Sequence, residues 1–357
     1  MRHTNHSGTP PVRFGAAVSL TGALSLQGNY VREGYDLFAK QINATGGILG
    51  RPVELILYDD QSDKTLVANL YEQLIVEDGV DFLLGPYGSE MTEVVAGITE
   101  KHQRVMIAPS ATVGSIWAKG YHWLFKITCP LENAGAGILA LAAQQGLKRV
   151  AFVHQDAMAP RAIAASAGAA ISQSGLQSVY LKSYPDGTMD FSAVLNEIAD
   201  TKPEVFIAAA VNLEELVNLT RQLRASDINP AIVACLPYGL LPEFQERLQN
   251  DAEGVMAATF WEKSLSTPGN AVFVNSYQTE YGRLPAVPAA VSYAGFDVLT
   301  QAINHTGDVN QKAVRDALLA LKTQTIVGDY MVDETGLQIG QKAATIQWRD
   351  GKQVVVG

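Results

Sequence analysis

Short apolar runs and helical patterns alternate along most of this chain. Residues 12–20 form an apolar run that predicts a strand, and apolar positions then recur at helical spacing from about residue 27 to 44. The same pair repeats over residues 53–75 and 82–102, and a fourth strand is expected at 104–108. A repeated strand–helix rhythm is typical of a parallel sheet with helices on both faces.

The rhythm starts again after Pro130. Helices are expected at 132–145, 161–174, 191–199 and 213–225, and strands at 150–154, 178–183, 205–210 and 231–235. The chain is therefore predicted to be an α/β protein with two doubly wound halves and a break near residues 126–131.

The last hundred residues follow a different pattern. A strand at 255–259 precedes three helical patterns at 271–281, 288–304 and 311–321. From residue 326 to 356, Val, Tyr, Ile and Trp alternate with polar residues around turn signals at 333–336 and 350–351. This alternation is typical of antiparallel hairpins.

Composition excludes several classes of protein. The 357 residues, 47% of them hydrophobic, suffice for two cores, and the net charge of −10 lacks the basic surface of a nucleic-acid-binding protein. No run of eighteen apolar residues predicts a membrane-spanning helix. Residues 1–8 are polar and do not form the apolar part of a secretory signal, so the protein is either cytoplasmic or lacks its leader here.

The usual enzyme signatures are absent from the sequence. There is no GxGxxG after the first strand, no GxxxxGK(S/T), no HExxH and no GxSxG. The lone thiols of Cys129 and Cys235 are expected to be buried, and Asp59, Asp60 and Asp63 are better explained by a strand end and a helix cap than by a cation site. No metal and no cofactor are expected.

One stretch, residues 81–92, leads from a strand into a helix through a Gly-Pro-Tyr-Gly-Ser loop. Helix N termini at the carboxyl ends of parallel strands offer free N–H groups, so Ser89 is either an N-cap or a residue that binds an anion or a carbonyl. Similar loops follow other predicted strands, at 19–27, 109–112, 154–159, 211–212 and 236–238. Since none carries a nucleophile, metal or phosphate signature, they indicate binding without turnover.

Residues 46–60 read GGILGRPVEL followed by ILYDD, which resembles the GGI-G-xx-ELxxxDD signature of leucine-isoleucine-valine type extracytoplasmic solute-binding proteins. Four further segments agree in order, at 18–22, 84–89, 108–112 and 273–277, and the resemblance covers about residues 12–356. It implies a type I periplasmic-binding fold. In that fold two Rossmann-like lobes, joined by three crossovers, close on a solute and deliver it to an ABC importer.

The resemblance assigns residues 12–126 and 257–324 to a first lobe and residues 127–256 and 325–357 to a second, with the ligand cleft between them. It implies a periplasmic or other extracytoplasmic protein that is not an enzyme. The implied partners are a small-molecule solute and a membrane permease, with no nucleic acid, and a monomer is expected. The disulfide of the family is replaced by Ser62 and Gly88.

In such proteins a ligand carboxylate is held by groups that correspond to Ser89, Ser110 and Thr112. The complete predicted set of ligand-binding residues is Leu20, Tyr87, Ser89, Ser110, Thr112, Ala159, Asn212, Tyr238 and Trp261. Tyr87, Tyr238 and Trp261 would supply apolar walls, although core packing explains Trp261 equally well.

Amino-acid-binding members carry an acidic residue after the fourth strand of the second lobe, where it pairs with the ligand ammonium. Here the corresponding loop ends in Pro237 and Tyr238, so an ammonium would need Asp156 or Glu214 to move in. An aromatic or aliphatic carboxylate is therefore favoured. A branched-chain amino acid, a cytoplasmic amide-type sensor and an enzyme site at His154 and Asp156 remain alternatives.

Overall fold

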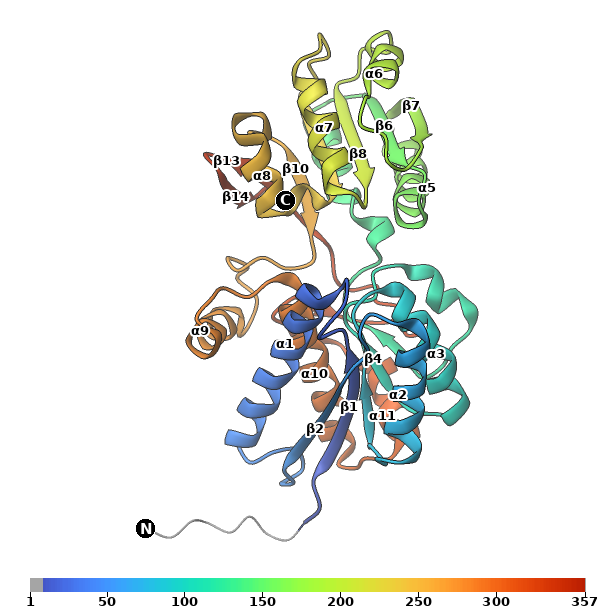
Figure 1. The fold of residues 1–357 in the computed structure, drawn as a ribbon, viewed down its shortest axis with the longest axis vertical. Coiled ribbons are helices and arrows are strands. Elements are labelled where there is room, and N and C mark those ends of the chain that lie inside the picture. The colour runs from blue at the N-terminus through green and yellow to red at the C-terminus, as the bar shows by residue number, and fades with distance from the viewer. Residues whose placement is uncertain (1–8, 357) are drawn as a thin grey trace. The chain divides into compact units, whose positions relative to one another are not determined.

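The computed structural model describes residues 9–356, which form two compact units (Figure 1). The first unit contains the chain up to Cys129 and Trp261–Lys342, and the second contains Pro130–Phe260 and the chain from Ala343. The chain thus passes between the units three times. No helix within residues 9–356 combines the length and apolar character needed to cross a bilayer.

The first unit is built on a parallel sheet with the strand order β2-β1-β3-β4-β5. Its strands are β1 (Val12–Val18), β2 (Val53–Asp59), β3 (Phe82–Leu84), β4 (Met106–Ala108) and β5 (Leu124–Lys126). Its helices are α1 (Ser25–Ala44), α2 (Lys64–Val76), α3 (Ser89–His102), α9 (Asn270–Tyr281), α10 (Val287–Thr306) and α11 (Gln311–Ala320). The predicted strand–helix rhythm is confirmed here.

The two faces of this sheet pack against different helices because successive strand residues point to opposite faces. On one face Ala17 joins the apolar core formed with α2 and α3. On the other, the ring of Phe14 lies 4.6 Å from that of Phe296 in α10. Helices α1 and α10 lie side by side (Figure 1), and a Cβ on Gly34 would come within 2.3 Å of the Ala289 carbonyl oxygen.

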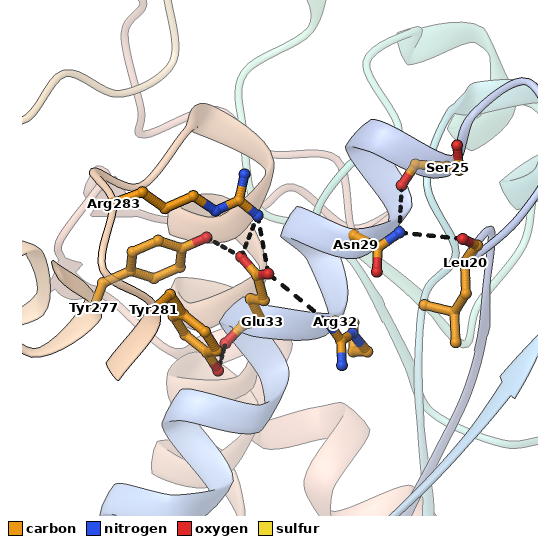
Figure 2. A network of polar contacts seen from close by, with 8 residues as sticks. All are labelled: Leu20, Ser25, Asn29, Arg32, Glu33, Tyr277, Tyr281 and Arg283. Carbon is orange, nitrogen blue, oxygen red and sulfur yellow. Dashed lines mark hydrogen bonds and ion pairs between the residues drawn. The ribbon is translucent and has the colours of Figure 1, made fainter. Parts of the chain in front are cut away.

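A polar network fastens α9 and the residues after it to α1 (Figure 2). The buried carboxylate of Glu33 accepts two hydrogen bonds of 2.9 Å from the Arg283 guanidinium and one from the Tyr277 hydroxyl. The Tyr281 hydroxyl donates to the Glu33 carbonyl at 3.1 Å. Because the carboxylate is almost fully buried, this pairing fixes the register of the two helices.

The second unit is built on a sheet with the strand order β14-β13-β10-β9-β8-β6-β7. Its parallel strands are β6 (Arg149–Gln155), β7 (Gln177–Tyr184), β8 (Val205–Ala210), β9 (Ile232–Pro237) and β10 (Met256–Thr259). Its antiparallel strands are β13 (Ala344–Arg349) and β14 (Lys352–Val355). The helices are α4 (Ala136–Gln144), α5 (Met158–Gln173), α6 (Ser192–Ala199), α7 (Leu213–Arg224) and α8 (Pro242–Leu248). Separate apolar cores cover the two faces of this sheet.

The lobe boundaries differ from those expected from the sequence. Residues 325–342, expected in the second lobe, lie in the first unit and include β12 (Gly328–Tyr330), which forms a hairpin with β11 (Thr323–Thr325). The Lys126 N–H donates to the Gly336 carbonyl at 2.9 Å, and the Gln338 side chain donates to the Ile127 carbonyl at 2.9 Å. Strands β13 and β14 form an antiparallel hairpin, as the alternation near the C terminus suggested, and β13 also pairs with β10.

Candidate functional site

The loop after β1 is held by the carboxylates that end β2. Asp59 accepts hydrogen bonds from the Leu20 N–H at 2.9 Å and from the Thr21 hydroxyl at 2.7 Å, and Asn29 donates to the Leu20 carbonyl (Figure 2). Burial raises the pKa of Asp59, but hydrogen bonds from Thr21, Gln61 and Leu20 outweigh it and lower the pKa below its usual value. The carboxylate therefore anchors half-buried Leu20 at the end of the strand.

The neighbouring acidic residues also have structural partners. Asp60 accepts from the Ser19 hydroxyl at 2.6 Å, and Asp63 is the N-cap of α2, as predicted. The Ser62 hydroxyl accepts from the Leu24 N–H at 3.0 Å. Within residues 9–356 no group of three or more His, Cys, Asp or Glu side chains is arranged to hold a metal ion.

Ser89 occupies the first position of α3, not the N-cap that was one of its two predicted roles. The cap is Gly88, whose φ of +87° suits glycine, and no side chain caps the helix. The Ser89 Oγ instead accepts hydrogen bonds from the backbone N–H groups of Thr112 at 2.9 Å and Val113 at 3.1 Å. It also lies 3.4 Å from Thr112 Oγ1.

The loop after β4 carries two further hydroxyl groups, those of Ser110 and Thr112. Thr112 is half-buried next to Ser89, whereas Ser110 is only 6% exposed. The Ser110 Oγ has no hydrogen-bond partner among the residues that the structure describes. A buried hydroxyl without a partner is unusual in a folded protein, and a bound ligand is one way to satisfy it.

These hydroxyl and amide groups suit an oxygen anion. Both lone pairs of the Ser89 oxygen accept amide protons, so its own hydrogen remains for donation. No imidazole or carboxylate within residues 9–356 hydrogen-bonds the Ser89 Oγ, so the geometry does not activate it as a nucleophile. Tyr87, also half-buried, lies in the loop that precedes Ser89.

In the second unit the remaining predicted residues follow three neighbouring strands. Ala159 lies in the first turn of α5 after β6, Asn212 follows β8, and Tyr238 follows β9; all three are half-buried. The Asn212 side chain caps α7 by accepting from the Glu214 N–H at 3.0 Å. Burial raises the pKa of Tyr238. The carboxyl ends of adjacent parallel strands thus gather these residues at one edge of the sheet.

Gln155, at the end of β6, is an organising residue that the sequence did not reveal. Its buried side chain accepts from the Val211 N–H at 2.9 Å and donates to Asp186 at 2.5 Å. It thereby joins the loops that follow β6, β7 and β8. The sequence did offer one sign of this role, since Gln155 is a polar residue at the end of an apolar strand, next to His154.

The carboxylates near this edge have partners of their own. Asp156 pairs with Arg161 at 2.6 Å, which lowers the pKa of Asp156, and Glu214 pairs with Arg247. Glu215 is buried and burial raises its pKa; its Oε1 accepts from the Gly187 N–H at 2.7 Å, whereas its Oε2 has no hydrogen-bond partner among the described residues. A cation at Asp156 or Glu214 would have to compete with these ion pairs.

Trp261 belongs to the first unit, where it is only 4% exposed. Its indole N–H donates to the Asn270 side chain at 2.7 Å, and its ring meets that of Phe273 edge-on at 5.8 Å. This arrangement is that of a core residue, the alternative that the sequence left open for Trp261.

Comparisons with known proteins agree with the architecture. The sequence model of a family described as periplasmic binding protein matches residues 11–353. The leucine-, isoleucine-, valine-, threonine- and alanine-binding protein of Pseudomonas aeruginosa is 24% identical over 327 residues, which cover 91% of this chain and 86% of that protein.

Two solved structures share the fold. The branched-chain amino acid transporter substrate binding protein LivJ from Streptococcus pneumoniae, in complex with isoleucine, has a TM-score of 0.77 and 21% identity, covering 96% of this chain and 97% of that chain. A solute binding protein of an ABC transporter from R. palustris, in complex with benzoate, has a TM-score of 0.76 and 19% identity, covering 97% and 96%. The chain therefore belongs to the periplasmic binding protein family and is similar to its leucine-, isoleucine- and valine-binding members.

Proposed function

We propose that this protein is the extracytoplasmic solute receptor of an ABC importer and that its solute is a small carboxylate, an aromatic or aliphatic acid. Membership in the periplasmic binding protein family supports the receptor role. Ser89, Ser110 and Thr112 are the groups proposed to hold the carboxylate, with Leu20 and Tyr87 beside them. Ala159, Asn212 and Tyr238 complete the proposed ligand-binding set, whereas Trp261 packs as a core residue.

The observation that carries this proposal is the bonding of the Ser89 oxygen. It accepts two backbone N–H groups, from Thr112 and Val113, in the way that a carboxylate oxygen would. A bound carboxylate can accept a hydrogen bond from the Thr112 N–H. The hydroxyl groups of Ser89, Ser110 and Thr112 can rotate and donate hydrogen bonds to the same carboxylate. Hydrogen bonds to an ionised acceptor are about twice as strong as neutral ones, so an acid is preferred over its amide.

The second unit supports an acid without an ammonium group. Asp156 and Glu214, the carboxylates that could approach an ammonium, are engaged by Arg161 and Arg247. A zwitterionic solute would have to displace one of these solvent-exposed pairs, which costs little, or bury its ammonium without a partner, which is costly. The benzoate complex of the R. palustris protein shows that the fold accommodates an acid of this class in that relative.

A branched-chain amino acid is the second candidate. It is favoured by the names of the similar proteins, which include a leucine-, isoleucine- and valine-binding protein and a structure with bound isoleucine. The two candidates differ in one chemical group, the α-ammonium, so ligands that differ only in that group separate them.

We also propose that solute binding draws the two units together, since the chain passes between them three times and each unit carries part of the proposed set. Small-angle scattering should record compaction on addition of a binding acid. An unchanged radius of gyration at saturation would contradict this part of the proposal.

A thermal-shift screen tests the function. The panel is benzoate, 4-methylpentanoate, the amides of both acids, leucine and valine. A ligand at 100 times its Kd should stabilise the protein by about 2.7 kcal/mol. Acids are expected to shift the unfolding temperature of the wild type, and Ser89→Ala should lose the shift.

Ser115→Ala, the same substitution at an exposed serine of the first unit, is the control and should keep the shift. Stabilisation by leucine or valine without stabilisation by either acid would overturn the ligand class. Equal stabilisation of Ser89→Ala and wild type by an acid would overturn the assignment of Ser89.

A further inference from the structure

Lys126, the last residue of β5, is a fully buried lysine directly behind the loop that carries Ser110 and Thr112. Its side chain is 0% exposed, and its backbone pairs with Ala108 of β4 and with Gly336. Burying an ammonium is costly unless polar groups meet it. We therefore consider which groups meet this ammonium and what its charge acts on.

The ammonium of Lys126 contacts the loop that follows β4. Lys126 Nζ donates to the carbonyl of Ala111 and lies 3.4 Å from Thr128 Oγ1. It also lies 5.1 Å from the centroid of the Trp117 ring, a distance at which a cation and an aromatic face attract. The carbonyl of Ala111 thus binds the cation directly.

The Ala111–Thr112 peptide connects this cation to the proposed carboxylate site. In a trans peptide the C=O and N–H bonds point in opposite directions. The carbonyl end contacts Lys126, and the N–H end donates to Ser89 Oγ at 2.9 Å. The peptide dipole consequently has its positive end toward Ser89, and the ammonium strengthens the donor by polarising the same peptide.

We propose that Lys126 is a positioning residue that selects an anionic solute through the Ala111–Thr112 peptide, without touching the solute. This inference rests on the proposed carboxylate function of Ser89 and Thr112. It identifies a positive charge close to a site that is otherwise made of hydroxyl and amide donors. It also predicts that the site discriminates charge, so a neutral amide of the same shape gains nothing from Lys126.

The expected effect follows from the distance. Bond lengths and hydrogen-bond lengths place the ammonium about 7 Å from a carboxylate oxygen accepting the Thr112 N–H. At an effective dielectric constant of about 20, a unit charge at that distance changes the affinity for an anion by roughly fiftyfold. The affinity for a neutral ligand should change by less than about twofold.

The test uses acetate and acetamide, the smallest acid and amide, as probes of the full-length protein. Backbone amide NMR follows the Thr112 resonance during each titration in wild type, Lys126→Met and Lys126→Gln. Methionine has nearly the length of lysine without its charge, and glutamine keeps an N–H donor for the Ala111 carbonyl. Lys119→Met, which removes an exposed lysine of the same unit, is the control.

We expect acetate to shift the Thr112 amide in wild type and in Lys119→Met, and to bind roughly fiftyfold more weakly to both Lys126 variants. The weak response to acetamide should be the same in all four proteins. A merely structural lysine would instead weaken acetate and acetamide equally, and that result would overturn the inference.

The two proposals fail in distinguishable ways. Acetate that binds the folded Lys126 variants as tightly as wild type overturns the role of Lys126 and leaves the carboxylate site standing. A wild-type Thr112 amide that does not respond to acetate at all overturns both proposals. Resonances of residues in the first unit that lie away from the loop after β4 report whether each variant is folded.

Discussion

Replacing Ser110 by alanine should stabilise the free protein and weaken acid binding, an unusual combination that follows from one buried atom. The Ser110 Oγ is buried and without a hydrogen-bond partner in the described chain, residues 9–356. An unsatisfied buried hydroxyl costs about 1–3 kcal/mol, and a small loss of packing offsets part of the gain from deleting it.

We therefore expect Ser110→Ala to raise the free energy of unfolding by about 1 kcal/mol. For a unit of roughly 200 residues this corresponds to an increase of about 2–4 °C in Tm. With an acid bound, the same hydroxyl is a proposed donor to a charged oxygen. Losing such a bond costs about 1.5–3 kcal/mol, so the affinity should fall roughly tenfold to a hundredfold.

Thermal unfolding without ligand and calorimetric titration with benzoate measure the two effects separately. Thr300→Val is a suitable control, because Thr300 Oγ1 in α10 is another buried hydroxyl without a partner in the described residues. This control should gain stability but keep its affinity. A Ser110→Ala protein that is less stable than wild type, or that binds acid equally well, would refute the reasoning.

Three further substitutions test the scaffold. Gly336→Ala should destabilise the first unit by roughly 2 kcal/mol or more in urea unfolding, because φ is +81° there and a Cβ would come within 2.3 Å of the Leu124 carbonyl oxygen. Glu33→Gln should cost roughly 2 kcal/mol in the same assay, since it breaks a buried pairing with partly exposed Arg283. Burial raises the pKa of Asp297 from 3.8 to about 6, so the folded state binds this proton more tightly than the unfolded state does. Stability should therefore fall as the pH rises from about 4 to 6. Asp297→Asn should remove that fall, which a series of Tm measurements against pH would show.

The sequence predicted the strand–helix order because apolar spacing is a local property of the chain. The strand at 205–210 coincides with β8, and Asp63 caps α2 as expected, since both depend on residues close in sequence. The hydrogen bonds of Asp59 explain why a pair of aspartates ends β2: they fasten the loop that contains Leu20.

Features that depend on distant residues were not predictable in this way. The Ser89 Oγ binds amides more than twenty positions away in preference to its own helix, because the glycine at 88 takes the cap position. Residues 325–342 join the first unit through contacts with β5 and the residues after it, which local alternation cannot reveal. Strand β5 itself escaped notice because it is short and ends in Lys126.

That lysine did leave a signal. It lies among the mostly apolar residues 123–131. A lysine in such a segment is either exposed at the edge of a sheet or buried with polar partners. Only the structure shows that the side chain is buried and that it contacts the carbonyl of Ala111.

The central claim is that the protein recognises a carboxylate and provides no partner for an ammonium. Calorimetric titration with leucine and with 4-methylpentanoate, which is leucine without its α-ammonium, tests this claim directly. The account predicts that 4-methylpentanoate binds at least about a hundredfold more tightly, because a buried ammonium without a partner costs several kcal/mol. Tighter binding of leucine than of 4-methylpentanoate would contradict it.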